Sequence, residues 1–268
     1  MTEHRQILDK LAARFLVQAL DENFAYAVSR GMGRAGKIES LEEQKIWQKI
    51  LNRWDAVLQN GGRPKINGLY RQKALLALAL TAHKYGLNID NIRPQALAAI
   101  DALNAQVALS DDFERKSPDI KAFLHTPPRP PKRRPPLPEN ITFYRPQDII
   151  AIRHKQHFYT AYIHEDTGIN EIPVIEFYDH VSDTPPTLAE IQKHPARGAH
   201  YQDGTTRIAR YAVAQMKYHP DPAGQISLIA AAIPQPPSHE HLAPAVGLYQ
   251  LTDIFTLQND IEYLFRPA

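Results

Sequence analysis

The chain contains no cysteine among its 268 residues. Disulfide bonds, thiolate metal ligands and cysteine nucleophiles are therefore excluded. Long apolar runs are also missing, because the longest candidate, residues 74–82, falls well short of the roughly 20 residues that a membrane-spanning helix needs. The first ten residues are charged and lack the apolar core of a signal peptide. Together these absences predict a cytoplasmic protein that does not enter a membrane.

Recognisable catalytic motifs are equally scarce. The sequence has no Gly-x-Ser-x-Gly nucleophile elbow, and no pair of histidines has the His-Glu-x-x-His spacing that puts two metal ligands on one helix face. His154 and His157 are three residues apart, and His239 and His241 flank Glu240 between prolines. Surface histidines account for this pattern better than a metal site does. We therefore expect no catalytic residues, no metal and no cofactor.

Proline, in contrast, is concentrated in one stretch, residues 126–139, with the sequence TPPRPPKRRPPLPE. Each proline fixes φ and removes a backbone donor, so neither a helix nor a sheet continues through such a stretch. Residues before it show helical patterns and residues after it show strand patterns. The sequence thus predicts an α+β protein in three parts: a helical bundle over 1–124, a basic proline-rich linker over 125–140 and a β-rich domain over 141–268.

Apolar periodicity predicts the helices of the first part. The expected ranges are 3–29, 41–59, 68–85 and 94–109, followed by a short helix that starts at 117. Ser40 and Glu43 have the spacing of a capping box for the second helix. The third helix is apolar on nearly all sides, so it is expected at the centre of the bundle.

Short β-branched and aromatic runs predict the strands of the last part. Their ranges are 148–153, 157–164, 172–179, 205–217 and 225–233, and the first two form a hairpin. Thr187 and Glu190 form a capping box for a short helix, and residues 249–265 are expected to form a closing helix. Several short strands with tight turns favour a small, bent sheet or a partly open barrel.

Charge is distributed unevenly along the chain. Residues 1–124 carry 18 Lys and Arg against 14 Asp and Glu, a net charge of +4, and residues 125–140 carry a net +3. Residues 141–268 carry 9 Lys and Arg against 14 Asp and Glu, a net −5. An acidic half repels nucleic acid and suits a basic partner protein, although the same charge also serves solubility.

The four cations of the linker are Arg129, Lys132, Arg133 and Arg134. They suit a phosphate backbone, so a nucleic-acid-associated regulator that uses the helical domain and the linker is one functional alternative. No aromatic residue that would stack on bases lies among them, and a semi-rigid spacer is the more economical interpretation.

Carboxylates and aromatic side chains gather around the strand expected at 172–179. The candidate partner-binding residues there are Glu165, Asp166, Glu176, Tyr178, Asp179 and Asp183. Such a surface would attract a basic protein and anchor it through aromatic contacts. A hydrolase that uses the His, Asp and Glu side chains of this domain is the second alternative.

The segment over residues 144–179 resembles bacterial polymorphic-toxin immunity proteins of the type-26 class. In that class an Asp-led apolar strand precedes a strand with Tyr and Ala, and a third strand ends near an aromatic-Tyr-Asp. The matching residues here are Asp148, Ile149, Ile150, Ile152, Tyr159, Ala161, Ile175, Tyr178 and Asp179. The family commonly has glycine before the Asp, where this chain has Gln147.

The resemblance covers about 40 residues of the chain and implies a small β-rich fold without catalytic residues. It also implies a function, namely to bind and neutralise a cognate toxin used in competition between bacteria. The leading hypothesis is therefore an immunity protein that occludes a toxin, with a homodimer as a further possibility for the chain.

Overall fold

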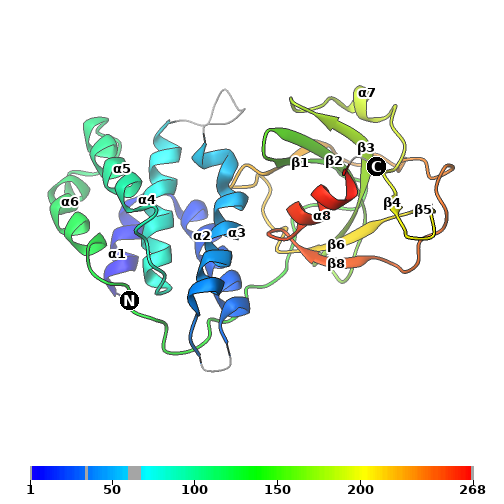
Figure 1. Ribbon diagram of the computed structural model, residues 1–268. Coiled ribbons are helices and arrows are strands. Elements are labelled where there is room, and N and C mark those ends of the chain that lie inside the picture. Colours follow the sequence, from blue (N-terminus) through cyan, green and yellow to red (C-terminus); the bar gives the residue numbers. More distant parts are fainter. Residues whose placement is uncertain (1, 34–35, 60–67, 267–268) are drawn as a thin grey trace. The chain divides into compact units, whose positions relative to one another are not determined.

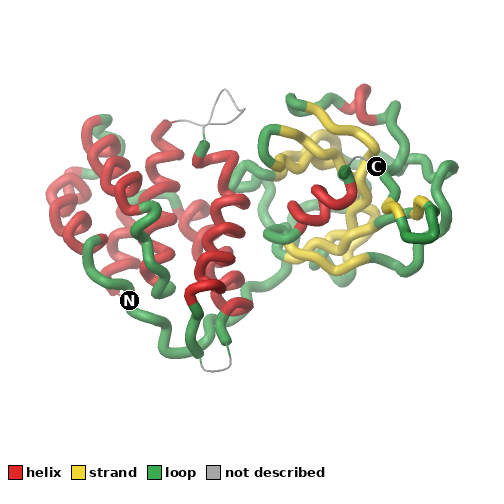
Figure 2. The backbone as a smooth tube through the Cα atoms, in the orientation of Figure 1, coloured by secondary structure: helices red, strands yellow, loops and turns green. Residues whose placement is uncertain are grey.

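The computed structural model describes residues 2–33, 36–59 and 68–266 (Figure 1). Helices form the first half of the chain, and a six-stranded mixed sheet with a closing helix forms the second, which confirms the α+β class (Figure 2). The chain divides into two compact units: Met1–Leu51 with Val57–Pro138, here called the helical unit, and Asn52–Ala56 with Glu139–Ala268, the β unit. No described helix is long and apolar enough to cross a membrane.

Among the described residues, six helices precede the sheet. They are α1 (Thr2–Lys10), α2 (Arg14–Gly31), α3 (Ser40–Leu58), α4 (Gly68–Lys84), α5 (Arg93–Ala105) and α6 (Asp111–Leu124). Helix α4 contacts α1, α2, α5 and α6, and its residues 74–83 are all buried. The prediction of a central third helix is thus confirmed. Helix α6 starts earlier than expected, with Asp111 and Asp112 in a first turn where carboxylates interact favourably with the helix dipole.

One local prediction in the first half is wrong. The helix expected over 3–29 is broken between α1 and α2, where Ala12 has a φ of 47° that a right-handed helix cannot contain. The second helix begins at Ser40, close to the predicted start. The carboxylate of Glu43 accepts the backbone N–H of Asn88 at 2.5 Å.

The proline-rich stretch groups with the helical unit as far as Pro138. It passes close to Gly86, which follows α4 with a φ of +77°. A Cβ atom at Gly86 would lie 2.7 Å from Pro130 Cα and 2.9 Å from the carbonyl oxygen of Arg129. Further along, Arg134 donates a hydrogen bond of 2.5 Å to a backbone carbonyl just beyond α2. The prolines therefore run along the helices in direct contact with them.

A chain of histidine hydrogen bonds fastens the beginning of this stretch. His83 Nε2 lies 2.9 Å from the Thr126 carbonyl oxygen, and His83 Nδ1 lies 2.8 Å from His4 Nε2. Since a carbonyl only accepts, His83 donates from Nε2 and accepts from His4 at Nδ1. This pattern requires a neutral His83. Burial is the main cause that lowers the pKa of His4 to about 4, and burial also lowers the pKa of His83, which favours the neutral form of both imidazoles.

We expect the helical unit to lose stability as the pH falls from 7.5 to 5. Because the folded-state pKa of His4 lies below its unfolded value, the unfolded chain binds more protons, and the stabilisation present above pH 6.5 is lost towards pH 4. Since His4 is only half-buried, we expect a loss of about 1–2 kcal/mol after solvent screening. Thermal unfolding against pH measures it. His4→Phe should flatten the profile, whereas His125→Gln, which changes an exposed neighbour, should not; equal profiles for both variants would contradict the assignment.

The described part of the second half, up to residue 266, contains eight strands and two helices. They are β1 (Ile149–His154), β2 (His157–Asp166), β3 (Pro173–Ser182), α7 (Leu188–Ile191), β4 (Ala199–His200), β5 (Thr206–Arg207), β6 (Arg210–Ala214), β7 (Ile226–Ala230), β8 (Gln250–Asp253) and α8 (Leu257–Leu264). Strands β4 and β5 form a separate two-stranded ladder, and the main sheet has the order β7-β1-β2-β3-β6-β8. All its neighbours are antiparallel except β6 and β8.

The β1–β2 hairpin and the capping box of α7 confirm the sequence predictions. Both the backbone N–H and the hydroxyl of Thr187 donate to Glu190 Oε2, at 2.7 and 2.8 Å. The helix expected over 249–265 is only partly correct. Residues 250–253 form β8 instead, because this segment pairs in parallel with β6, a partner about 40 residues earlier in the chain.

The sheet carries apolar layers on both faces. On one face Phe177 meets Phe265 and Tyr211 edge to face, with ring centroids 5.8 and 6.0 Å apart, and α8 lies across this face (Figure 1). On the other face Tyr178 packs with Tyr162 and Ile191. The polar cluster described next belongs to this second face, because Glu176 and Tyr178 alternate with Phe177 along β3.

Candidate functional site

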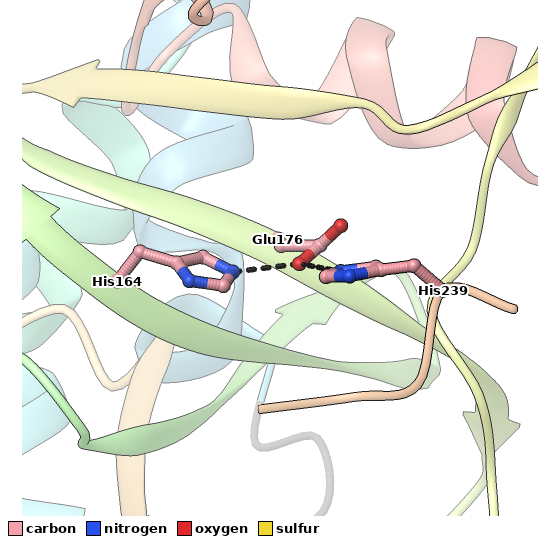
Figure 3. A group of neighbouring side chains, drawn as sticks. All are labelled: His164, Glu176 and His239. Carbon is pink, nitrogen blue, oxygen red and sulfur yellow. Dashed lines mark hydrogen bonds and ion pairs between the residues drawn. The ribbon is translucent and has the colours of Figure 1, made fainter. Parts of the chain in front are cut away.

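Two histidine side chains of the β unit converge on one buried carboxylate, that of Glu176 (Figure 3). Oε2 of Glu176 lies 2.6 Å from His164 Nε2 and 2.7 Å from His239 Nε2. The two imidazoles reach the carboxylate from opposite sides, His164 from β2 and His239 from the loop between β7 and β8 (Figure 3). We call these residues the His–Glu–His cluster.

The β2–β3 pairing explains how His164 reaches Glu176. Tyr162 pairs with Glu176 and Ile163 with Ile175, but the register then shifts so that Glu165 pairs with Val174. His164 is the extra residue at this shift. A β-bulge locally re-aims a side chain, and here the imidazole turns towards the carboxylate of the neighbouring strand.

Backbone hydrogen bonds hold the loop that supplies His239. The Ala196 N–H donates to the Ser238 carbonyl at 2.9 Å, and Ala196 itself forms an isolated bridge with Tyr178 of β3. The Leu242 N–H donates to the His239 carbonyl at 2.8 Å. The residue before His239 is therefore tied to β3 through Ala196, and a local turn follows His239.

The carboxylate of Glu176 is 0% exposed, and its second oxygen, Oε1, has no hydrogen-bond partner among the described residues. Arg210, which pairs with Glu176 across β3 and β6, brings Nε to 4.0 Å from Oε2. A buried carboxylate is costly unless it is compensated by charge or hydrogen bonds. Two imidazoles and one guanidinium supply this compensation on the Oε2 side only.

The surroundings of the cluster are largely apolar. The ring of Tyr162 stands edge-on to His164 at 4.9 Å, and its hydroxyl donates to the Ile233 carbonyl at 3.0 Å. Burial raises the pKa of Tyr162 and of Tyr178 above their usual value, so both phenols stay protonated. The ligand atoms of the cluster lie within 4.8 Å of one another, a spacing at which a metal ion is coordinated.

Sequence reasoning named Glu176 and His239 separately and did not single out His164. The histidines were compared by spacing along the chain, whereas the cluster joins residues from three elements. One signal was present: Glu176 is the only charged residue in the apolar run from Ile172 to Tyr178. A lone carboxylate in a buried strand requires partners, and it therefore marks a polar site.

The six predicted partner-binding residues do not form one surface. Glu176 and Tyr178 are buried, so they are inaccessible to a docked protein. Asp166 is half-buried, and burial raises its pKa. Of the exposed three, Asp179 pairs with Arg197 at 3.0 Å, Asp183 pairs with His157 at 2.7 Å, and Glu165 follows His164 on β2.

The linker cations lie at the surface. Arg129, Lys132, Arg133 and Arg134 are all exposed, and Arg134 also donates a hydrogen bond to a backbone carbonyl of the helical unit. Four exposed cations without stacking aromatics make a modest electrostatic surface.

A different surface of the β unit is apolar and exposed. It comprises Val246, Leu248, Tyr249 and Leu251, which we call the apolar edge, and the exposed fractions of the three aliphatic residues are 71, 83 and 68%. Strand β8 ends the sheet, and no described strand pairs with its outer side. Beside it lies a hollow of about 620 Å³, lined by Tyr201, Tyr249 and Tyr263 among others.

No family model, curated protein or solved structure matches the chain.

Proposed function

We propose that the β unit binds and neutralises a cognate protein toxin in the cytoplasm, and that the toxin docks along the apolar edge. The observation that carries this proposal is a group of exposed apolar residues on and beside an unpaired edge strand. Natural proteins protect such edges with charges, prolines or covering segments, because an open apolar edge recruits other chains. Here the edge strand β8 exposes Leu251, and the segment just before it exposes Val246 and Leu248.

The geometry of β8 favours an extended segment of the partner. A strand added at an edge gains backbone hydrogen bonds, while its alternate side chains enter pockets beside the sheet. The hollow, with Tyr201, Tyr249 and Tyr263 in its lining, lies next to β8 and provides aromatic anchor positions. Helix α8 stiffens the strand from behind, since Thr252 donates to Asp260 at 2.6 Å. A rigid edge lowers the entropic cost of binding.

Charge and one backbone angle add support. The net charge of −5 over residues 141–268 steers a basic partner towards the β unit. Gln147 has a φ of 73°, in the left-handed region that favours glycine. Type-26 immunity proteins commonly have glycine at the matching position. The backbone at this point thus suits the family pattern even though the residue differs.

A growth assay with the product of the adjacent gene tests the proposal. Cells that express this product as the toxin should grow when the full chain is co-expressed, and the two proteins should elute together on size-exclusion chromatography. The double variant Leu248→Asp, Leu251→Asp places two charges on the apolar edge, so protection should be lost and the dissociation constant should rise at least about 100-fold.

Ile169→Asp is the matched control. Ile169 is 90% exposed and lies in the turn between β2 and β3, away from β8 in sequence and pairing. This variant should protect as the wild type does. Protection by the double variant, absence of a complex, or self-association through the apolar edge would each overturn the proposal.

A further inference from the structure

We propose that the His–Glu–His cluster is a binding site for a divalent transition-metal ion of the Zn²⁺ type. The ligand set is Nε2 of His164, Nε2 of His239 and the carboxylate of Glu176. Two imidazoles with one carboxylate are a donor set that binds Zn²⁺ and its neighbours in the first transition row. The site is independent of the proposed toxin binding, since none of its residues belongs to the apolar edge.

The unpartnered oxygen of Glu176 is the second observation. Oε1 is buried without a hydrogen bond among the described residues, although the side chain is 0% exposed. A buried acceptor without a partner is rare in a native protein, because its desolvation is not compensated. A metal ion held by the carboxylate compensates its negative charge, which the two oxygens share. A purely structural hydrogen-bond cluster leaves Oε1 unexplained.

Metal binding would widen the two His–Glu distances slightly and draw the two imidazole nitrogens, which lie within 4.8 Å of each other, closer together. Metal–ligand bonds of about 2.0–2.1 Å in a tetrahedral site place ligand atoms roughly 3.3 Å apart. The His–Glu separations are now 2.6 and 2.7 Å, so each must widen by less than an ångström. Each imidazole then carries its proton on Nδ1 and offers the Nε2 lone pair to the metal. Three protein ligands leave one position for water or an anion.

Arg210 sets the preference for that fourth ligand. Its Nε atom lies 4.0 Å from Glu176 Oε2, and the side chain is about one third exposed, at 32%. A guanidinium at this distance weakens cation binding but attracts an anion to the open position. Removing the positive charge should therefore strengthen metal binding, whereas removing a ligand should abolish it. A variant that merely unfolds would lose metal binding in both cases, so stronger binding without the Arg210 charge distinguishes a metal site from loss of folding.

The metal would also fasten the loop that follows β7. His239 lies in the segment between β7 and β8, and this segment reaches Val246 and Leu248 before β8 begins. The metal would link this loop to β2 and β3 through the other two ligands. Metal binding should therefore raise the unfolding temperature of the β unit, since an ion that binds only the native state stabilises it by mass action.

Isothermal titration of the full chain with ZnCl₂, after removal of metal by a chelator, tests the site. The wild type should bind one Zn²⁺ ion per chain with a dissociation constant below about 10 μM. His239→Asn should weaken this binding at least about 100-fold, because loss of a direct ligand exceeds the effect of an outer partner. His241→Asn, an exposed histidine of the same loop, should bind as the wild type does. Arg210→Gln should bind several-fold more tightly.

Two results would overturn the site. One is an equal affinity of the wild type and His239→Asn for Zn²⁺, which would mean that surface histidines bind the ion. The other is no binding below about 1 mM by the wild type, which leaves the cluster as a hydrogen-bonded carboxylate. Circular dichroism of each variant shows whether it is folded, and the thermal shift with Zn²⁺ provides a readout that does not depend on any activity. Failure of the growth assay has no bearing on either result.

Discussion

Replacement of Phe177 by alanine is expected to lower the free energy of unfolding of the β unit by about 3–5 kcal/mol. Phe177 is fully buried at the centre of the sheet and contacts the rings of Tyr211 and Phe265 edge to face. The substitution removes the side chain that joins β3, β6 and the end of α8. A cavity of this kind does not collapse easily, because strands fix its walls.

Urea unfolding followed by far-UV circular dichroism measures this loss, with the transition of the β unit treated separately from that of the helical unit. Phe143→Ala is the matched control, since Phe143 is 52% exposed and only stacks on Tyr218 at 6.5 Å. It should cost less than about 1 kcal/mol. Similar losses for both variants would show that Phe177 does not hold the core.

The second large effect is expected at Gly86, where the helices meet the proline-rich stretch. Gly86→Ala should destabilise the helical unit by about 2–4 kcal/mol, from the left-handed backbone angle and from a steric clash. The clash arises because the new methyl group would lie 2.7 Å from Pro130 Cα. Pro130 Cα and the carbonyl oxygen of Arg129, the two closest atoms, both belong to the backbone, so no side-chain rotation relieves the clash.

Gly36→Ala separates these two contributions. Gly36 has a φ of +70°, close to that of Gly86, but nothing lies within 4 Å of its added Cβ. This variant should cost only about 1 kcal/mol, from the backbone angle alone. The difference between the two variants, measured by thermal unfolding, isolates the contact with the prolines. Equal losses would mean that the stretch moves away from α4 without cost.

Much of the fold was predictable because its signals are local. The apolar α4, the β1–β2 hairpin and the capping box of α7 each depend on residues within one short segment. The break at Ala12 was not predictable, because apolar spacing continues through it from Leu11 to Phe15. The parallel pairing of β8 with β6 was also missed, since a short segment before a helix shows no sign of a strand partner about 40 residues away.

The His–Glu–His cluster shows the same limit in the candidate site. Its three residues come from β2, β3 and a loop more than 60 residues further on, and a register shift turns His164 towards the others. Spacing rules detect ligands that share one helix or one loop. They do not detect ligands that meet only when a sheet is assembled.

The position of β8 and α8 late in the chain has a consequence for synthesis. The helical unit needs residues only as far as Pro138, and domains fold in order from the N-terminus as they leave the ribosome. The main sheet, in contrast, is complete only after β8 has paired with β6 and Phe265 has packed on Phe177. At about 5–20 residues per second, strands β1–β3 emerge several seconds before these residues exist. A ribosome that stalls before residue 250 therefore leaves β6, with its buried Tyr211 and Val213, as an open apolar edge, and such nascent chains are the form of this protein most prone to aggregate.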